Sequence, residues 1–270
     1  MLGKLFKHEF KAQYKMYGGI YIAILLIGVV SCILGVISDK FPNNVVVKNL
    51  FAFSIVMAVV ALVAMFIMTL VLSIYRYYNN LIKDQGYLMH TLPVPSFNHH
   101  IVKLIVPIVW FAADAVVTFI MIIFMTRDLK FGWFDIIKGL MDALEIDMSA
   151  GNITVALIYM LMGIISSLSL FYACCNVGSL SNSNKGLMAF VSYMAFYMIN
   201  QIISLIGMFV FMGVLAIKEG IGIGQILMSE EPPAGYFSGI LLTTVIISVV
   251  LIILYNVVSY YVLTKKVNLE

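Results

Sequence analysis

Six long apolar stretches constrain the fold of this 270-residue chain more than any other feature of its sequence. A helix needs about 20 apolar residues to cross the roughly 30 Å hydrocarbon core of a bilayer, and each stretch reaches that length. The stretches cover residues 18–37, 50–73, 104–126, 153–180, 186–217 and 236–263. They are too long for membrane β-strands and lack their alternation, and backbone groups in lipid need local hydrogen bonds. The sequence therefore predicts an all-α integral membrane protein with six transmembrane helices in one membrane domain, residues 1–270.

The composition excludes the two other broad classes of protein. Hydrophobic residues make up 63% of the chain and charged residues 11%, whereas a soluble domain has about 45–50% and about 25%. Disordered chains deviate in the opposite direction, towards charge and away from apolar residues. The first apolar stretch is also longer than the usual 7–15-residue core of a signal peptide, and no small-residue cleavage site follows it. We expect it to remain in the protein as the first span.

The distribution of lysine and arginine predicts the orientation. With six spans both termini share one side, and that side carries ten of the sixteen basic residues. They are Lys4, Lys7, Lys11, Lys15, Arg76, Lys83, Lys103, Lys185, Lys265 and Lys266. The positive-inside rule places such a side in the cytoplasm. The net charge of +3 is thereby explained by topology, and we do not expect a nucleic-acid partner.

The segment 1–17 has the pattern of an amphipathic helix. Leu2, Leu5, Phe6 and Phe10 recur at helical spacing, and four lysines provide a cationic surface. This pattern predicts a helix lying along the cytoplasmic leaflet, with its lysines near anionic headgroups. The alternative is a cytoplasmic cap on the first span, whose lysines only fix the orientation.

The polar segment 74–103 between the second and third spans is the most informative connection. Its apolar residues suit a short exposed helix that binds another protein, and Pro93 and Pro95 force an extended break before the third span. A loop lying on the membrane is the simpler alternative. His90, His99 and His100 lack convincing metal-ligand spacing, so we interpret them as polar anchors at the membrane interface.

Two of these segments carry a resemblance to a known family. The N-terminal LGKLFKHEFKA and the later IKDQGYLMHTLPVPSFNHHIVKL resemble permease subunits of ABC-2 type transporters from Gram-positive bacteria. The six-span layout with internal termini also matches, although the distinctive residues are confined to positions 2–12 and 83–104. The resemblance implies a subunit of the cell membrane that works with a second permease copy and separate ABC ATPase subunits.

The resemblance also implies roles for both segments. The amphipathic N-terminus would be the connecting helix, and a coupling helix would sit on the ATPase subunit. The coupling residues are Lys83, Asp84, Gln85, Gly86, Tyr87, Leu88 and Met89. No G-x-x-x-x-G-K-[ST] phosphate loop occurs in the sequence, so this chain cannot form that ATP site itself. We expect no catalytic, metal-binding or cofactor-binding residues here, with ATP and Mg²⁺ bound on the partner subunit.

Two segments on the opposite side of the membrane have a pattern of their own. Residues 127–151 suit an amphipathic helix that either gathers a substrate or lies solvated on the membrane surface. The fifth apolar stretch is longer than a bilayer requires and is followed by several glycines and two prolines. In the resembling family this region often forms short external re-entrant helices, and residues 212–235 are the candidates here.

Asp114 is the one ionisable residue within the six apolar stretches, apart from tyrosines and cysteines. An acid in the membrane is costly and is a functional candidate by default. Asn200 and Gln201 occupy a comparable depth in the fifth stretch, so a contact with either is geometrically possible. Three roles are open: a structural hydrogen bond, a part in a cavity or conformational change, and proton coupling.

The leading hypothesis is the membrane permease subunit of an ATP-driven exporter, with lipids, hydrophobic drugs and antimicrobial peptides all compatible as cargo. The alternatives are a proton-coupled secondary transporter centred on Asp114 and a non-transporting membrane scaffold or sensor. One acid without a partner relay supports the secondary transporter only weakly.

Overall fold

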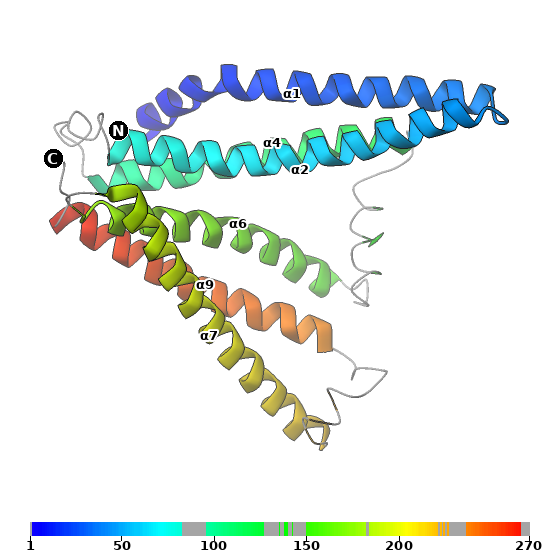
Figure 1. Cartoon of the computed structure of the whole chain (residues 1–270). Helices are drawn as coiled ribbons and strands as arrows, with labels where there is room; N and C mark the ends of the chain where they lie inside the picture. The colour runs from blue at the N-terminus through cyan, green and yellow to red at the C-terminus, as the bar shows by residue number, and fades with distance from the viewer. Residues whose placement is uncertain are drawn as a thin grey trace. The chain divides into compact units, whose positions relative to one another are not determined.

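Long helices make up nearly all of the described structure. The computed structural model describes residues 2–82, 96–126, 135, 138–139, 142, 150–181, 184–220, 222, 224, 226 and 236–265. Six helices within these residues are long and apolar enough to cross a membrane. They are α1 (Leu2–Lys40), α2 (Val45–Leu81), α4 (Ser96–Thr126), α6 (Ala150–Gly178), α7 (Lys185–Glu219) and α9 (Tyr236–Lys265), as Figure 1 shows. The prediction of six apolar helices and an all-α membrane protein is confirmed.

The helices extend beyond the apolar stretches that predicted them. α1 has 39 residues, which corresponds to about 58 Å at 1.5 Å per residue, against a hydrocarbon core of roughly 30 Å. The predicted N-terminal helix is therefore not a separate element, because residues 2–17 form the first part of α1 without a break. Its placement along the membrane surface stays a prediction.

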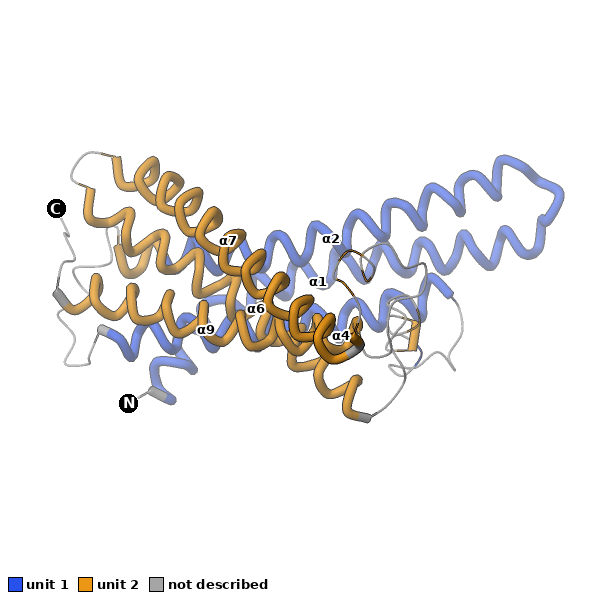
Figure 2. Tube along the Cα trace, turned by 90° about the horizontal axis from the view of Figure 1, so that it is seen from below, with its two compact units in different colours: residues 1–77, 92–135 blue, residues 78–91, 136–270 orange. Residues whose placement is uncertain are grey.

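The chain divides into two compact units, coloured separately in Figure 2. Unit 1 comprises residues 1–77 and 92–135 and contains α1, α4 and nearly all of α2. Unit 2 comprises residues 78–91 and 136–270 and contains α6, α7 and α9.

In unit 1, α1 turns back into α2 through residues 41–44. The side-chain oxygen of Asn44 accepts hydrogen bonds from the backbone N–H groups of Val46 and Val47, at 3.0 and 3.4 Å. This cap satisfies two of the N–H groups that have no partner at the start of a helix. Farther along, Ser31 Oγ donates to the carbonyl oxygen of Ser54 at 3.1 Å and ties the two helices together.

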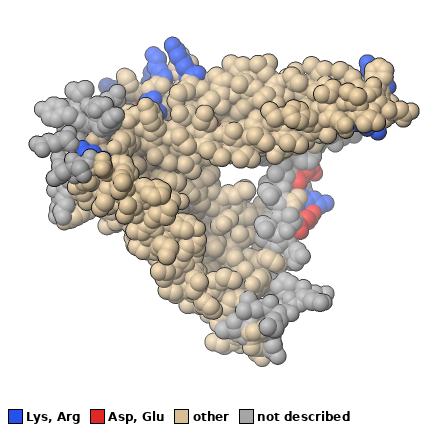
Figure 3. Space-filling view, viewed as in Figure 1, with Lys and Arg blue, Asp and Glu red and all other residues tan. Residues whose placement is uncertain are grey.

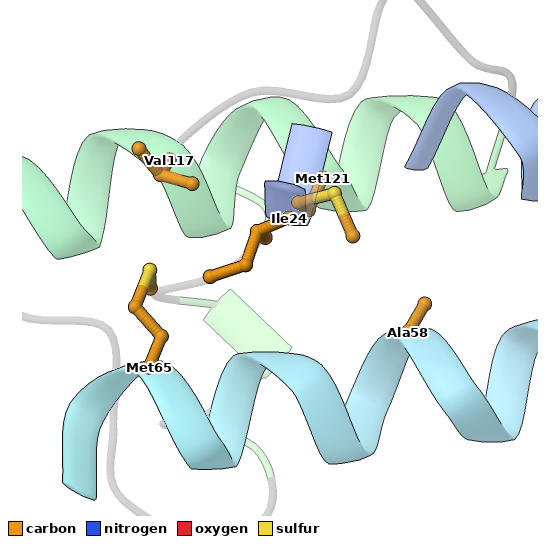
Figure 4. Packing of buried hydrophobic residues seen from close by; sticks show 5 residues of the cluster. All are labelled: Ile24, Ala58, Met65, Val117 and Met121. Atoms are coloured by element: carbon orange, nitrogen blue, oxygen red, sulfur yellow. The ribbon is translucent and has the colours of Figure 1, made fainter. Parts of the chain in front are cut away.

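A cluster of apolar side chains holds the three helices of unit 1 together around the middle of α1. Figure 4 shows Ile24 of α1, Ala58 and Met65 of α2, and Val117 and Met121 of α4 facing a common space. Lipid is as apolar as these side chains, so close packing rather than escape from water stabilises such contacts.

Gly28 lies where α1 approaches α4 closely. A Cβ atom at this position would meet Met121 Sδ, and it would lie 2.8 Å from Cδ2 of Phe124. We expect Gly28→Leu to lower the free energy of unfolding by about 1–3 kcal/mol through overpacking. The matched control is Gly19→Leu on the same helix, where a Cβ would meet nothing within 4 Å. Thermal unfolding of both variants in one detergent measures the difference, and equal midpoints would contradict the prediction.

Unit 2 is built on the packing of α6 against α9 and α7. Leu170, Ala173 and Cys174 of α6 form a buried cluster with Leu251 and Tyr255 of α9. The amide of Asn256 donates to Ser169 Oγ at 3.2 Å and adds a polar contact between the same two helices.

The end of α7 lies within the candidate re-entrant segment. The candidate re-entrant segment 212–235 begins inside α7, which continues through Gly213 to Glu219. The helix ends at Gly220, whose φ of 69° is left-handed and suits glycine. Most of residues 221–235 lie outside the described residues, so the re-entrant segment stays a prediction.

Candidate functional site

Four side chains with polar groups follow one another along α1 at four-residue spacing. They are Glu9, Gln13, Tyr17 and Tyr21. Residues four apart lie on one face of a helix, and this face packs against α2 and α4 of unit 1. We call these four residues and their partners on α2 and α4 the polar seam.

At one end of the polar seam lies a charge cluster formed by Glu9, Arg76 and Lys103. Glu9 Oε1 accepts a hydrogen bond from Lys103 Nζ at 2.7 Å, and Glu9 Oε2 accepts one from Arg76 at 3.3 Å. The side chains of Glu9 and Lys103 are only 7% and 6% exposed, and that of Arg76 is 23% exposed. The amide of Gln13 donates a further hydrogen bond to Glu9 Oε2, also at 3.3 Å.

The charge cluster joins three segments that are far apart in sequence. Glu9 belongs to the start of α1, Arg76 to the end of α2 and Lys103 to the start of α4. A buried charge is costly unless it is paired and hydrogen-bonded. Because one carboxylate contacts two cations, Glu9 is the shared partner of Lys103 and Arg76 in this cluster.

Aromatic rings continue the polar seam away from the charge cluster. The ring of Trp110 stacks on Phe10 at a centroid distance of 4.7 Å and on Tyr17 at 4.1 Å. The hydroxyl of Tyr17 donates to the backbone oxygen of Thr69 at 3.4 Å. Leu5, Phe6 and Phe10 therefore pack in part within the protein, beside Trp110 and its neighbours.

The opposite, basic face of the same segment is exposed, as expected for an amphipathic helix. Lys4, Lys7, Lys11 and Lys15 are all exposed. On the face that Figure 3 shows, basic side chains gather over the two ends of α1, with an uncharged surface between them. This separation suits a helix that crosses an apolar layer and extends beyond it.

Asp114 lies at the inner end of the polar seam and is fully buried. Its Oδ1 accepts a hydrogen bond of 2.8 Å from the hydroxyl of Tyr21. The expected contact with Asn200 or Gln201 stays untested, because those residues belong to unit 2. The amide of Gln201 donates instead to the hydroxyl of Tyr197 on its own helix, at 2.9 Å, and Asn200 lines a cavity in unit 2.

The Tyr21 contact leads us to expect that Asp114 is mainly structural. Asp114→Asn retains an acceptor for the Tyr21 hydroxyl, so its thermal unfolding midpoint should stay close to that of the unaltered protein. Asp114→Leu removes the 2.8 Å acceptor and leaves the Tyr21 hydroxyl only its longer 3.3 Å contact with the backbone oxygen of Trp110, which should cost about 1–3 kcal/mol. Thermal unfolding of both variants in one lipid mixture tests this. An Asn variant as unstable as the Leu variant would show that the charge itself is needed.

The sequence indicated that the histidines at the start of α4 are polar anchors at the membrane interface. The structure contradicts this, because both side chains are buried. His99 and His100 are 2% and 0% exposed. His100 Nδ1 lies 2.8 Å from the hydroxyl of Tyr77, and the His100 ring stacks with Phe97. His100 therefore helps to pack α4 against α2 within unit 1.

The structure leaves the predicted coupling residues untested and adds residues that the sequence did not single out. Residues 83–89 lie outside the described residues. Glu9, Arg76 and Lys103 were recognised only as charges that fix orientation. One signal was available, because Glu9 is the first acid of the chain and begins the four-residue pattern that continues to Tyr21.

The described fold and site together define a class: a multi-pass, all-α membrane protein whose first three long helices enclose buried charges. Among the described residues no group of three or more histidine, cysteine, aspartate or glutamate side chains is placed to hold a metal ion. No family model, curated protein or solved structure matches the chain.

Proposed function

We propose that this chain is the membrane permease subunit of an ATP-driven exporter of the ABC-2 type. It would act in the cell membrane with both termini in the cytoplasm, beside a second permease copy. Separate ABC ATPase subunits would bind ATP and Mg²⁺. The proposal combines the six apolar helices with the resemblance carried by residues 2–12 and 83–104.

One observation supports this proposal above the others. The two segments that carry the resemblance are linked by the 2.7 Å ion pair between Glu9 and Lys103. Glu9 lies in the first segment, and Lys103 is the next-to-last residue of the second. The N-terminal part of α1 is therefore fastened to the start of α4.

This link suggests how movement of an ATPase could enter the membrane. α4 begins at Ser96, a few residues after the proposed coupling residues 83–89. A displacement of the coupling segment would move the start of α4, and the charge cluster would carry α1 with it. Packed helices transmit such displacements because a close-packed interior is not readily compressed.

The test is reconstitution with candidate ABC ATPase subunits from the same organism, sought first among the neighbouring genes. We expect the ATPase to co-purify with this chain and the pair to show vanadate-sensitive ATP hydrolysis. Efflux of a hydrophobic dye from vesicles should require both subunits and ATP. If this chain, without an ATPase, moves dye when a proton gradient is imposed, the result would favour a secondary transporter. Failure to bind any candidate ATPase would contradict the proposal.

A further inference from the structure

A cavity of about 370 Å³ lies within unit 2, between α6, α7 and α9. Drug-sized ligands occupy cavities of roughly 300–1,000 Å³. The cavity lies beside the middle parts of α6 and α7 and the first half of α9. Ser166 and Ser167 of α6, Asn200 of α7 and Thr244 of α9 are among its lining residues. Each lies well inside its helix and far from both helix ends.

The lining is unusually polar for this depth. Seven of the fourteen lining residues carry a hydroxyl or amide in an aliphatic side chain: Ser166, Ser167, Asn200, Ser204, Thr243, Thr244 and Ser248. Polar side chains within a membrane span are costly unless they are hydrogen-bonded or face a cavity with a polar occupant. None of the lining residues is an acid, a lysine, an arginine or a histidine.

Some of these groups are satisfied by their own helix, and others are not. The hydroxyls of Ser167 and Ser248 donate to backbone oxygens four residues earlier, at 2.9 and 2.8 Å. Within the part of the chain that the structure describes, Asn200, Ser166 and Ser204 have no hydrogen-bond partner for their side chains. These three groups come from α6 and α7 and line the same cavity.

The remaining lining is apolar and reaches the surface. Met208, Phe211, Ile247 and Leu251 contribute apolar surface to the cavity. Tyr159 and Met208 are 40% and 49% exposed, so the cavity opens beside them. A ligand could enter from the surrounding hydrocarbon without crossing water.

We propose that this cavity binds the polar part of an uncharged amphiphile drawn from the bilayer. The amide of Asn200 can donate to an ester or hydroxyl oxygen and accept from a hydroxyl, and the two serines can do the same. The apolar lining holds the adjoining hydrocarbon. A charged headgroup is disfavoured, because the lining supplies no opposite charge to replace its hydration.

This site concerns binding alone and does not depend on an ATPase partner. If the exporter function is also correct, the same chemistry describes its cargo. Binding is therefore measured without ATP. A cavity that does not bind the probe and a chain that does not export with an ATPase can then be told apart.

The experiment uses the full chain in lipid nanodiscs and a diacylglycerol that carries a photoactivatable diazirine on one acyl chain near the glycerol. The charged comparison probe is a phosphatidic acid with the same acyl chains and diazirine. At a low mole fraction of probe, mass spectrometry of the digested protein locates the labelled residues. We expect the neutral probe to concentrate on cavity residues of α6, α7 and α9 and to exceed labelling by the charged probe there.

Two variants and one matched control make the test specific. Asn200→Leu removes the amide at similar volume and should lower cavity labelling about fivefold to tenfold. Gly163→Leu should exclude the probe by filling space, since a Cβ there would meet nothing within 4 Å. Gln201→Leu removes the adjacent amide, which bonds Tyr197 and does not line the cavity, and should leave labelling unchanged.

Three outcomes would overturn the proposal. They are labelling spread evenly over all six helices, equal labelling by the charged probe, and labelling that Asn200→Leu leaves unchanged. Thermal unfolding midpoints are compared alongside. A variant that unfolds early is replaced by Ser204→Ala, which should lower labelling by a smaller factor, and unchanged labelling in that variant also counts against the site.

Discussion

Glu9→Gln should destabilise unit 1 more than removal of either of its cationic partners. The carboxylate of Glu9 contacts both Lys103 and Arg76, at 2.7 and 3.3 Å. Its removal leaves two buried or half-buried positive charges close together with no counter-charge from Glu9. Breaking a buried ion pair by removing one partner costs about 3–5 kcal/mol. We expect a loss of this size in the free energy of unfolding, measured by thermal unfolding in one lipid mixture.

Companion variants separate the lost charge from lost packing. Lys103→Met keeps most of the side-chain volume and leaves Glu9 paired with Arg76, so its cost should be smaller. The double variant Glu9→Gln/Lys103→Met should cost less than the sum of the two single variants, because it removes the buried lysine charge as well. Asp39→Asn provides the matched control, since it neutralises an exposed acid near the other end of α1.

The relative sizes of these losses in the free energy of unfolding test whether Glu9 is the shared partner of Lys103 and Arg76. A Lys103→Met variant as unstable as Glu9→Gln would show that the lysine has a role beyond balancing Glu9. Additive single and double variants would show that the two side chains act independently. A Glu9→Gln variant as stable as Asp39→Asn would contradict the importance of the charge cluster.

The number and position of the long helices could be predicted from the sequence because the bilayer imposes one simple length requirement. Each of the six predicted stretches lies almost entirely within one observed helix. The helix ends could not be predicted in the same way, because hydropathy reports only the apolar part of a helix. α1 extends sixteen residues before its apolar stretch, and Glu9 and Tyr17 in this part are hydrogen-bonded to groups on α2 and α4.

The sequence singled out a residue of the polar seam only where placing that residue in the membrane is costly by itself. Asp114 is conspicuous in sequence because an acid in an apolar stretch needs an explanation, yet its partner Tyr21 looked like one of many aromatic residues. Glu9 and Lys103 lie in polar surroundings in the sequence, where a charge is ordinary. Their pairing across 94 positions depends on how α1 packs on α4, which no local pattern records.

The cavity of unit 2 also depends on how helices pack, which a local sequence pattern does not show. Ser166 and Thr244 are each unremarkable within an apolar stretch, because a hydroxyl can donate to the backbone of its own helix, and the sequence indicated Asn200 only as a possible partner of Asp114. Their significance comes from convergence on one space between three helices. Hydropathy averages such residues away, so no local pattern in the sequence marks this cavity.

The double variant Tyr87→Ala/Leu88→Ala should abolish coupling to the ATPase while leaving the membrane fold intact. These two residues belong to the proposed coupling segment, which lies outside the described residues, so the argument comes from the sequence. A tyrosine can bury its ring while its hydroxyl stays hydrogen-bonded, and the neighbouring leucine can fill an apolar cleft. Truncating central anchors of an interface commonly costs roughly 2 kcal/mol or more each. We therefore expect ATPase binding to weaken on the order of a hundredfold to a thousandfold.

The six helices should still form in this variant, because neither residue belongs to an apolar stretch. The matched control is Tyr75→Ala, which removes a tyrosine that is 61% exposed on α2 and lies at the start of segment 74–103, before the coupling residues 83–89. Co-purification, ATPase stimulation and dye efflux are compared for both variants in one lipid mixture. The double variant should lose all three, since force from nucleotide closure can reach α4 and the charge cluster only through a bound ATPase. If all three are retained, residues 83–89 are not the coupling element, and the ATPase must act on another part of the chain.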